Sequence, residues 1–212
     1  MSGILVAGGA MAALLASTVS GQGVSTATDA PSEKITVGIQ TINGSGCPAG
    51  TAAVAVSSDN TAFTVTYSDY LAVAGDGASP VDFRKNCQLS LDVHIPSGFT
   101  YAIASVDYRG YAYLASGATG LQKAQYYFQG SSQTASSEET FAGPYDDNWH
   151  ANKTTDWAGL VWSPCGEDKN VNINTELRVS SGDSDGTSFM TMDSTDGAVS
   201  TTYHLAWQEC PS

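Results

Sequence analysis

The sequence predicts an all-β protein, an antiparallel β-sandwich or jelly roll stapled by disulfides. Hydrophobic residues recur at every second position in segment after segment, which is typical of half-buried strands. Clusters of Gly, Asn, Asp and Ser separate these segments at intervals of about 8–12 residues, as in sandwiches built from many short strands. No window carries a helical stripe longer than two turns.

The alternation is clearest where Leu89, Leu91 and Val93 take turns with polar residues. Turn-forming residues at 57–60, 96–98 and 181–186 predict hairpins. The Gly-, Ser- and Thr-rich segment 130–140 is expected to be a long exposed loop. Strands are predicted at 35–40, 51–57, 63–67, 89–95, 99–108, 111–115, 121–129, 155–162, 171–179, 187–192 and 203–207.

The N-terminal region divides into three parts. An apolar, small-residue run at 4–19, followed by Ser20 and Gly21, predicts a signal peptide over 1–21. A membrane anchor is the alternative, and the shortness of the run and its lack of flanking basic residues disfavour it. Residues 22–33 are rich in Ser, Thr and Ala and are expected to form a flexible leader. Residues 34–212 then form a single β-sandwich domain.

Four cysteines, Cys47, Cys87, Cys165 and Cys210, predict two disulfides, because even numbers of cysteines in secreted chains usually pair. Sequence alone leaves three connectivities open. We favour Cys47–Cys87 with Cys165–Cys210, since each bridge then closes one sub-region. The sequence lacks a CxxC pair or an adjacent histidine that would indicate a metal site, so no metal is expected.

The charge balance restricts the partners. Eight Lys and Arg against 21 Asp and Glu give a net charge of −13. Such an acidic protein is not expected to bind nucleic acid or, after signal cleavage, a membrane. The sequons at Asn43 and Asn152 predict glycosylation and fit a secreted, extracellular protein.

The sequence gives little support for the known arrangements of catalytic residues. The Gly-x-Ser-x-Gly elbow of a Ser/His/Asp hydrolase is missing from the sequence. The acidic pairs at 138–139 and 146–147 are adjacent, whereas a glycosidase needs two carboxylates about 5–9.5 Å apart across the scissile bond. Asp-Gly pairs at 185–186 and 196–197 could offer calcium ligands, but they are ordinary turn residues. No residue is assigned a catalytic role, and no cofactor is expected.

Aromatic residues are the most specific candidate for ligand binding. Tyr108, Tyr111, Tyr113 and Trp149 could stack against sugar rings, and Tyr111 and Tyr113 share one face of a predicted strand. Aromatic residues are also common in strands and often pack in the core. The expected partner is a cell-wall polysaccharide or an extracellular protein.

Several short motifs follow one another along the chain. They are Gly46-Cys47-Pro48-Ala49-Gly50, Phe83-Arg84-Lys85-Asn86-Cys87, Pro96-Ser97-Gly98-Phe99, Tyr108-Arg109-Gly110 and Trp207-Gln208-Glu209-Cys210. With these motifs the chain resembles small secreted fungal and actinobacterial proteins of the domain-of-unknown-function family 4360, over about Ile39 to Cys210. The resemblance implies secretion, disulfides and a β-sandwich, and it implies no activity.

These observations lead to three hypotheses. The first is a secreted protein of an uncharacterised family that acts by non-catalytic binding, at a cell wall or a host surface. The alternative is an extracellular hydrolase of glycans or peptides with a carboxylate pair in the concave sheet. The third is a structural surface protein, which the low charge density would also fit.

Overall fold

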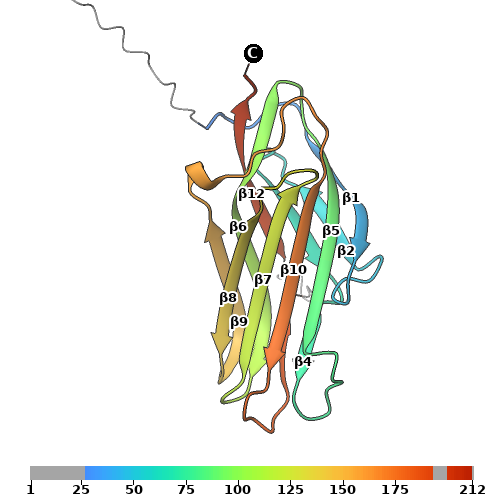
Figure 1. Cartoon of the computed structure of the whole chain (residues 1–212), viewed down its shortest axis with the longest axis vertical. Helices are drawn as coiled ribbons and strands as arrows, with labels where there is room; N and C mark the ends of the chain where they lie inside the picture. The colour runs from blue at the N-terminus through green and yellow to red at the C-terminus, as the bar shows by residue number, and fades with distance from the viewer. Residues whose placement is uncertain (1–26, 193–199, 212) are drawn as a thin grey trace, which may run out of the picture.

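The computed structural model describes residues 27–192 and 200–211, which form two antiparallel sheets with a shared hydrophobic core (Figure 1). The predicted all-β sandwich is confirmed. The first sheet has five strands and lies toward the viewer in Figure 1. In order across the sheet, its strands are β1 (Thr36–Asn43), β5 (Arg84–His94), β10 (Val171–Ser180), β7 (Thr119–Phe128) and β8 (Ala135–Ala142).

The second sheet has seven strands, and β6 is its central member. One edge of β6 pairs with β12 and β11, and the other edge pairs with β9. The strands are β2 (Ala52–Val56), β3 (Ala62–Tyr67), β12 (Thr201–Glu209), β6 (Phe99–Leu114), β11 (Ser188–Thr191), β4 (Leu71–Ala74) and β9 (Tyr145–Thr154).

Strand β6 is longer than the sequence predicts. The segments 99–108 and 111–115, expected as two strands, form one continuous strand of 16 residues. Gly110 does not break it. Its missing side chain makes room for Trp149 of β9, whose indole would lie 2.4 Å from a Cβ at this position. The glycine therefore marks a close approach inside the core, which a sequence pattern does not distinguish from a turn.

Two other segments correct the expected strand pattern. The loop expected at 130–140 contains the start of β8, which pairs with β7 as an edge strand. The strand expected at 155–162 is instead a loop with a short 3-10 helix at Trp157–Gly159 and an isolated bridge from Trp162 to Ala102. The ring of Trp157 packs on that of Trp162. In both places local composition misleads, because an edge strand can be polar and a loop can carry aromatic residues.

Large aromatic side chains from both sheets fill the space between the sheets. Phe63 stacks on Tyr203 with ring centroids 4.8 Å apart, and Tyr101 contacts both Phe128 and Trp207. All five side chains are almost fully buried. Phe128 comes from the five-stranded sheet and the other four come from the seven-stranded sheet, so these contacts join the two sheets.

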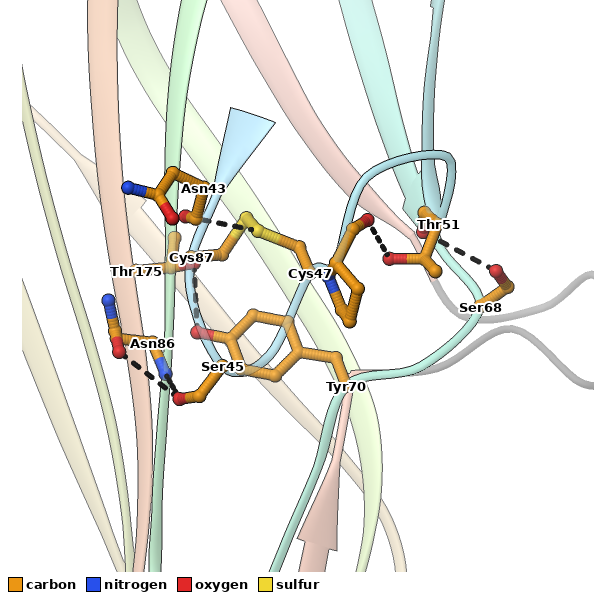
Figure 2. Close-up of a disulfide and its surroundings, with 10 residues drawn as sticks. Asn43, Ser45, Cys47, Thr51, Ser68, Tyr70, Asn86, Cys87 and Thr175 are labelled. Carbon is orange, nitrogen blue, oxygen red and sulfur yellow. Dashed lines mark hydrogen bonds between the residues drawn. A yellow bond between two sulfur atoms is a disulfide. The ribbon is translucent and has the colours of Figure 1, made fainter. Parts of the chain in front are cut away.

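Two disulfides close the structure, and they join Cys47 to Cys87 and Cys165 to Cys210. This is the pairing that the sequence analysis favours. Cys47 and Cys87 are buried, and their bridge ties the loop after β1 to strand β5 (Figure 2). Cys165 and Cys210 lie nearer the surface and fasten the loop before β10 to the end of β12.

The predicted signal peptide, 1–21, and residues 22–26 of the predicted leader lie outside the described residues. The rest of that leader, 27–33, is held against the domain, in contrast to the flexible segment expected from its composition. The backbone N–H of Thr28 donates to the carbonyl of Trp207, at 3.0 Å. The side-chain amide of Asn60 donates to the carbonyls of Pro31 and Glu33, at 2.8 and 2.9 Å. These bonds come from distant residues, so local composition does not reveal them.

Candidate functional site

The outward face of the five-stranded sheet carries a hollow of about 460 Å³, which we call the polar hollow. It crosses β5, β10, β7 and β8, and Figure 1 shows these strands side by side. Its lining is mostly amide and charged side chains: Arg84, Asn86, Cys87, Gln88, Leu121, Lys123, Gln125, Glu138, Asn174, Thr175, Glu176 and Arg178.

Amide side chains form a row across the floor of the polar hollow. Gln88 of β5 pairs in register with Asn174 of β10, which pairs with Gln125 of β7. The register extends the row to Asn43 on one side and to Ser136 on the other. Five strands at a spacing of about 4.8 Å make the row about 19 Å long.

The central amides of this row are available to a ligand. Within the part of the chain that the structure describes, the side chains of Gln88, Asn174 and Gln125 make no hydrogen bond, and all three are at least partly exposed. Each amide carries both a donor and an acceptor, as a sugar hydroxyl does. The row can therefore exchange hydrogen bonds with a polyhydroxylated chain in several orientations.

A charged cluster occupies one end of the polar hollow. Arg84 and Arg178 lie directly opposite each other on β5 and β10. Glu176 accepts a hydrogen bond from each, at 2.6 Å from Arg84 Nε and 2.6 Å from Arg178 Nη2. Burial raises the pKa of Glu176, but the two arginines outweigh burial and hold the pKa below its ordinary value. The carboxylate therefore stays charged and offsets the repulsion between the arginines.

The carboxylates of the polar hollow do not favour the hydrolase alternative. Glu176 and Glu138 both line it, and Lys123 lies between them in register and pairs with Glu138 at 3.8 Å. A glycosidase of the usual kind needs one carboxyl group whose pKa is raised so that it can donate a proton. The pKa of Glu176 is shifted in the opposite direction.

The buried disulfide supports this site from below. Cys87 points inward between Asn86 and Gln88, which both line the polar hollow. Figure 2 shows the Ser45 hydroxyl bonded to Asn86, at 3.2 Å from its Oδ1. Beside the bridge, the Tyr70 hydroxyl bonds to Thr175 of β10, at 3.1 Å. The disulfide and its neighbours thus fix β5 relative to the β1 loop and β10.

Two of the four aromatic residues expected to stack on sugar rings are not at the surface. Tyr108 and Trp149 point into the core and are each 1% exposed. Tyr108 faces inward because every second residue of this part of β6 faces the core, and Trp149 fills the space left by Gly110. Neither can contact a ligand at the surface.

Tyr111 and Tyr113 do reach the surface, on the outward face of the seven-stranded sheet. Phe189 of β11 joins them, with ring centroids 5.9 Å from Tyr111 and 6.0 Å from Tyr113. We call these three residues the aromatic strip. Tyr113 is 43% exposed, whereas the hydroxyl of Tyr111 is bonded to Asp146. Sequence reasoning missed Phe189, because only the pairing of β11 with β6 brings it beside the tyrosines.

A third polar cluster lies on the same face as the aromatic strip, around Asp107 of β6. Asp107 accepts hydrogen bonds from Asn152, at 2.8 Å, and contacts His150 and His204 at 2.9 and 2.8 Å. The hydrogen bond from Asn152, together with those from the histidines, lowers the pKa of Asp107 to about 2. Among the described residues, no set of three or more His, Cys, Asp or Glu side chains is arranged to hold a metal ion.

Both predicted glycosylation sites are exposed. Asn43 is the last residue of β1, at the edge of the amide row, and Asn152 lies on β9 beside Asp107. Glycosylation at either asparagine stays a prediction. Of the two Asp-Gly pairs that could offer calcium ligands, the pair at 196–197 lies outside the described residues.

Comparison with known proteins gives three similarities. The family model described as domain of unknown function (DUF4360) matches residues 33–210. An uncharacterized secreted protein of Arthroderma benhamiae is 37% identical over 170 residues, which are 80% of this chain and 69% of that protein. The solved complex of TmCBM61 with beta-1,4-galactotriose aligns with a TM-score of 0.28 and 10% identity, over 81% of this chain and 90% of the other. A similarity this low carries no argument about the ligand.

The secreted relative confirms the predicted extracellular location. A search of residues 27–192 and 200–211 finds no helix with the length and apolarity to cross a bilayer.

Proposed function

The chain belongs to the DUF4360 family, and from this premise we propose that it is an extracellular protein that binds polysaccharide in the polar hollow without cleaving it. The observation that carries the proposal is the amide row. Gln88, Asn174 and Gln125, which have no partner among the residues the structure describes, present donors and acceptors in one row across three strands. Hydroxyl groups on a sugar chain are the complement of such a row.

The strand framework makes the amide row a stable binding surface. Each amide projects from a central strand, and the neighbouring strands and the Cys47–Cys87 bridge fix its position. Side chains on rigid strands lose less entropy on binding than side chains on loops. A polysaccharide lying along the row would contact β5, β10 and β7 together.

The aromatic strip is the alternative surface for the same function, because sugar rings also stack on exposed aromatic faces. The ring of Phe189, however, already lies beside both tyrosine rings, and the Tyr111 hydroxyl is already bonded to Asp146. We therefore place the main binding surface on the five-stranded sheet and use the strip as the comparison in the test.

The test is a retention assay of the purified mature protein on insoluble chitin, β-glucan, cellulose and mannan. The unbound fraction is read from its intrinsic tryptophan fluorescence. We expect retention on at least one polymer, and loss of most of it in the double variant Asn174→Ala, Gln125→Ala. Gln208→Ala removes an amide from β12 of the other sheet, away from the aromatic strip, and is the matched control.

The possible results separate the two surfaces. Retention lost in Tyr111→Ala, Tyr113→Ala but kept in the amide variant would move the site to the aromatic strip. Full recovery of the wild type in every supernatant would refute polysaccharide binding for these polymers. Release of soluble sugar from a retained polymer would overturn the non-catalytic assignment and support the hydrolase.

A further inference from the structure

Basic residues are concentrated in the polar hollow of this acidic protein. The chain carries eight Lys and Arg and a net charge of −13, yet three of those eight line this one site. They are Arg84, Lys123 and Arg178, against the two carboxylates Glu138 and Glu176. The site therefore has a local charge of +1, opposite in sign to the whole molecule.

The two arginines, which we call the arginine pair, are held side by side by a single carboxylate. Glu176 accepts one hydrogen bond from Arg178, and both Nε and Nη2 of Arg84 contact its other carboxylate oxygen. A guanidinium group has five N–H donors, so within 27–192 and 200–211 most donors of Arg178 and several of Arg84 have no partner. Both arginine side chains are 47% exposed, so a ligand in the hollow can reach these donors.

We propose that the arginine pair binds the carboxylate of a uronate unit in an acidic polysaccharide whose neighbouring units lie on the amide row. The inference rests on the proposed function and names the class of sugar that the site selects. Guanidinium groups match planar carboxylates with two parallel hydrogen bonds. One bound carboxylate would neutralise the +1 charge of the hollow.

The position of the arginine pair relative to the amide row supports this assignment. Along β10, Arg178 lies four residues from Asn174 on the same face of the sheet, with Glu176 between them. The distance is about 13 Å at 3.3 Å per residue, so a short oligosaccharide can contact both at once. The remaining surface is acidic and repels polyanions, which confines a uronate polymer to this site.

The experiment compares two forms of one ligand, with its carboxyl groups either free or methyl-esterified. Binding of oligogalacturonate and of its fully methyl-esterified form to the full mature chain is measured by calorimetry at about 0.15 M salt, where charges more than about 8 Å apart are largely screened. We expect the free acid to bind about tenfold more tightly than the ester, as a charge-assisted hydrogen bond implies. Arg178→Gln should reduce the affinity for the acid to that for the ester.

Arg109→Gln is the matched control, since it removes the same charge from the outward face of the other sheet. It should leave both affinities within about twofold, because a screened charge on the far face contributes little. Equal binding of acid and ester would overturn the uronate inference, and so would equal losses in the two arginine variants. Dextran sulfate binding as tightly as the free acid would replace carboxylate recognition with general anion attraction.

The failure of the uronate inference and the failure of the proposed function are distinguishable. If the ester and the acid bind equally and the double variant Asn174→Ala, Gln125→Ala weakens both, the polysaccharide site stands and the uronate inference falls. If none of the ligands in either assay binds, or if the amide variant binds them all as the wild type does, the proposed site on this sheet falls as well.

Discussion

Removal of the buried disulfide is expected to cost more stability than removal of the peripheral one, although the two close loops of similar length. The sequence separations are 40 and 45 residues. In the chain-entropy model each bridge contributes about 4 kcal/mol, and the two contributions differ by roughly 0.1 kcal/mol. The constraint on the unfolded chain is therefore nearly the same for both bridges, and any larger difference must come from the folded state.

The folded surroundings of the bridges differ clearly. Cys47 and Cys87 are buried, whereas Cys165 is exposed and Cys210 is half-buried. Replacing a buried sulfur by hydrogen leaves a void of about one methylene, worth about 1 kcal/mol each. The double variant Cys47→Ala, Cys87→Ala should lose about 6 kcal/mol, and the corresponding Cys165, Cys210 variant about 4 kcal/mol.

Urea unfolding followed by tryptophan fluorescence measures both losses. A domain usually has about 5–15 kcal/mol of stability, so the first variant is expected to be marginal. If it does not fold, the wild type and both variants are compared in a stabilising osmolyte such as sucrose, which strengthens burial in all three and keeps the difference measurable. Equal losses, or a larger loss at the peripheral bridge, would refute the packing argument. Losses below about 1 kcal/mol at both would refute the loop-closure estimate.

Three further predictions test local features. A Cβ at Gly46 would lie 2.2 Å from the ring of Tyr70. Gly46→Ala should therefore lower the free energy of unfolding in urea by about 1–3 kcal/mol. An unchanged midpoint would contradict this steric argument. Gln122 is fully buried, and neither of its amide atoms has a hydrogen-bond partner among the described residues. Gln122→Leu should therefore raise the free energy of unfolding by about 1 kcal/mol. A lower melting temperature would show that the amide does have a partner. The lowered pKa of Asp107 contributes stability that is fully present above the ordinary value of 3.8 and is lost as the pH falls through about 2. Asp107→Asn should remove this part of the acid dependence. An acid-unfolding curve that is the same in the variant and the wild type would contradict the prediction.

The sequence predicts the sandwich well because its central strands obey a simple alternation. Leu89, Leu91 and Val93 of β5 all face the core. The turn at 96–98, however, is not the hairpin that its residues predict, because it leads from β5 into β6 of the other sheet. β9 shows why other elements are harder to predict. Its inward residues are few, chiefly Trp149 and Ala151, and the rest of its sequence is polar like a loop. Such an edge strand depends on its partner β6 more than on its own composition.

The candidate site is harder still to predict, because it depends on the order of the strands in the sheet. Gln88, Gln125 and Asn174 are far apart in the sequence, and each reads only as the polar face of a strand. Strand order β5-β10-β7 brings them into one row. The same holds for Arg84 and Arg178, which have no common motif. Alternation indicates the outward faces of β5 and β10, but it does not indicate which strands are their neighbours.

The bridge between Thr28 and Trp207 has a practical consequence for handling the protein. It places the beginning of the described chain beside the end of β12, so both lie at one end of the sandwich, as Figure 1 shows. The arginine pair lies toward the opposite end, where Ser180 at the end of β10 pairs with Thr119 after β6. The ten residues of β10 span about 33 Å. A sensor chip or fluorophore coupled through either end of the described chain would therefore stand clear of the arginine pair, and both attachments should report the same affinity.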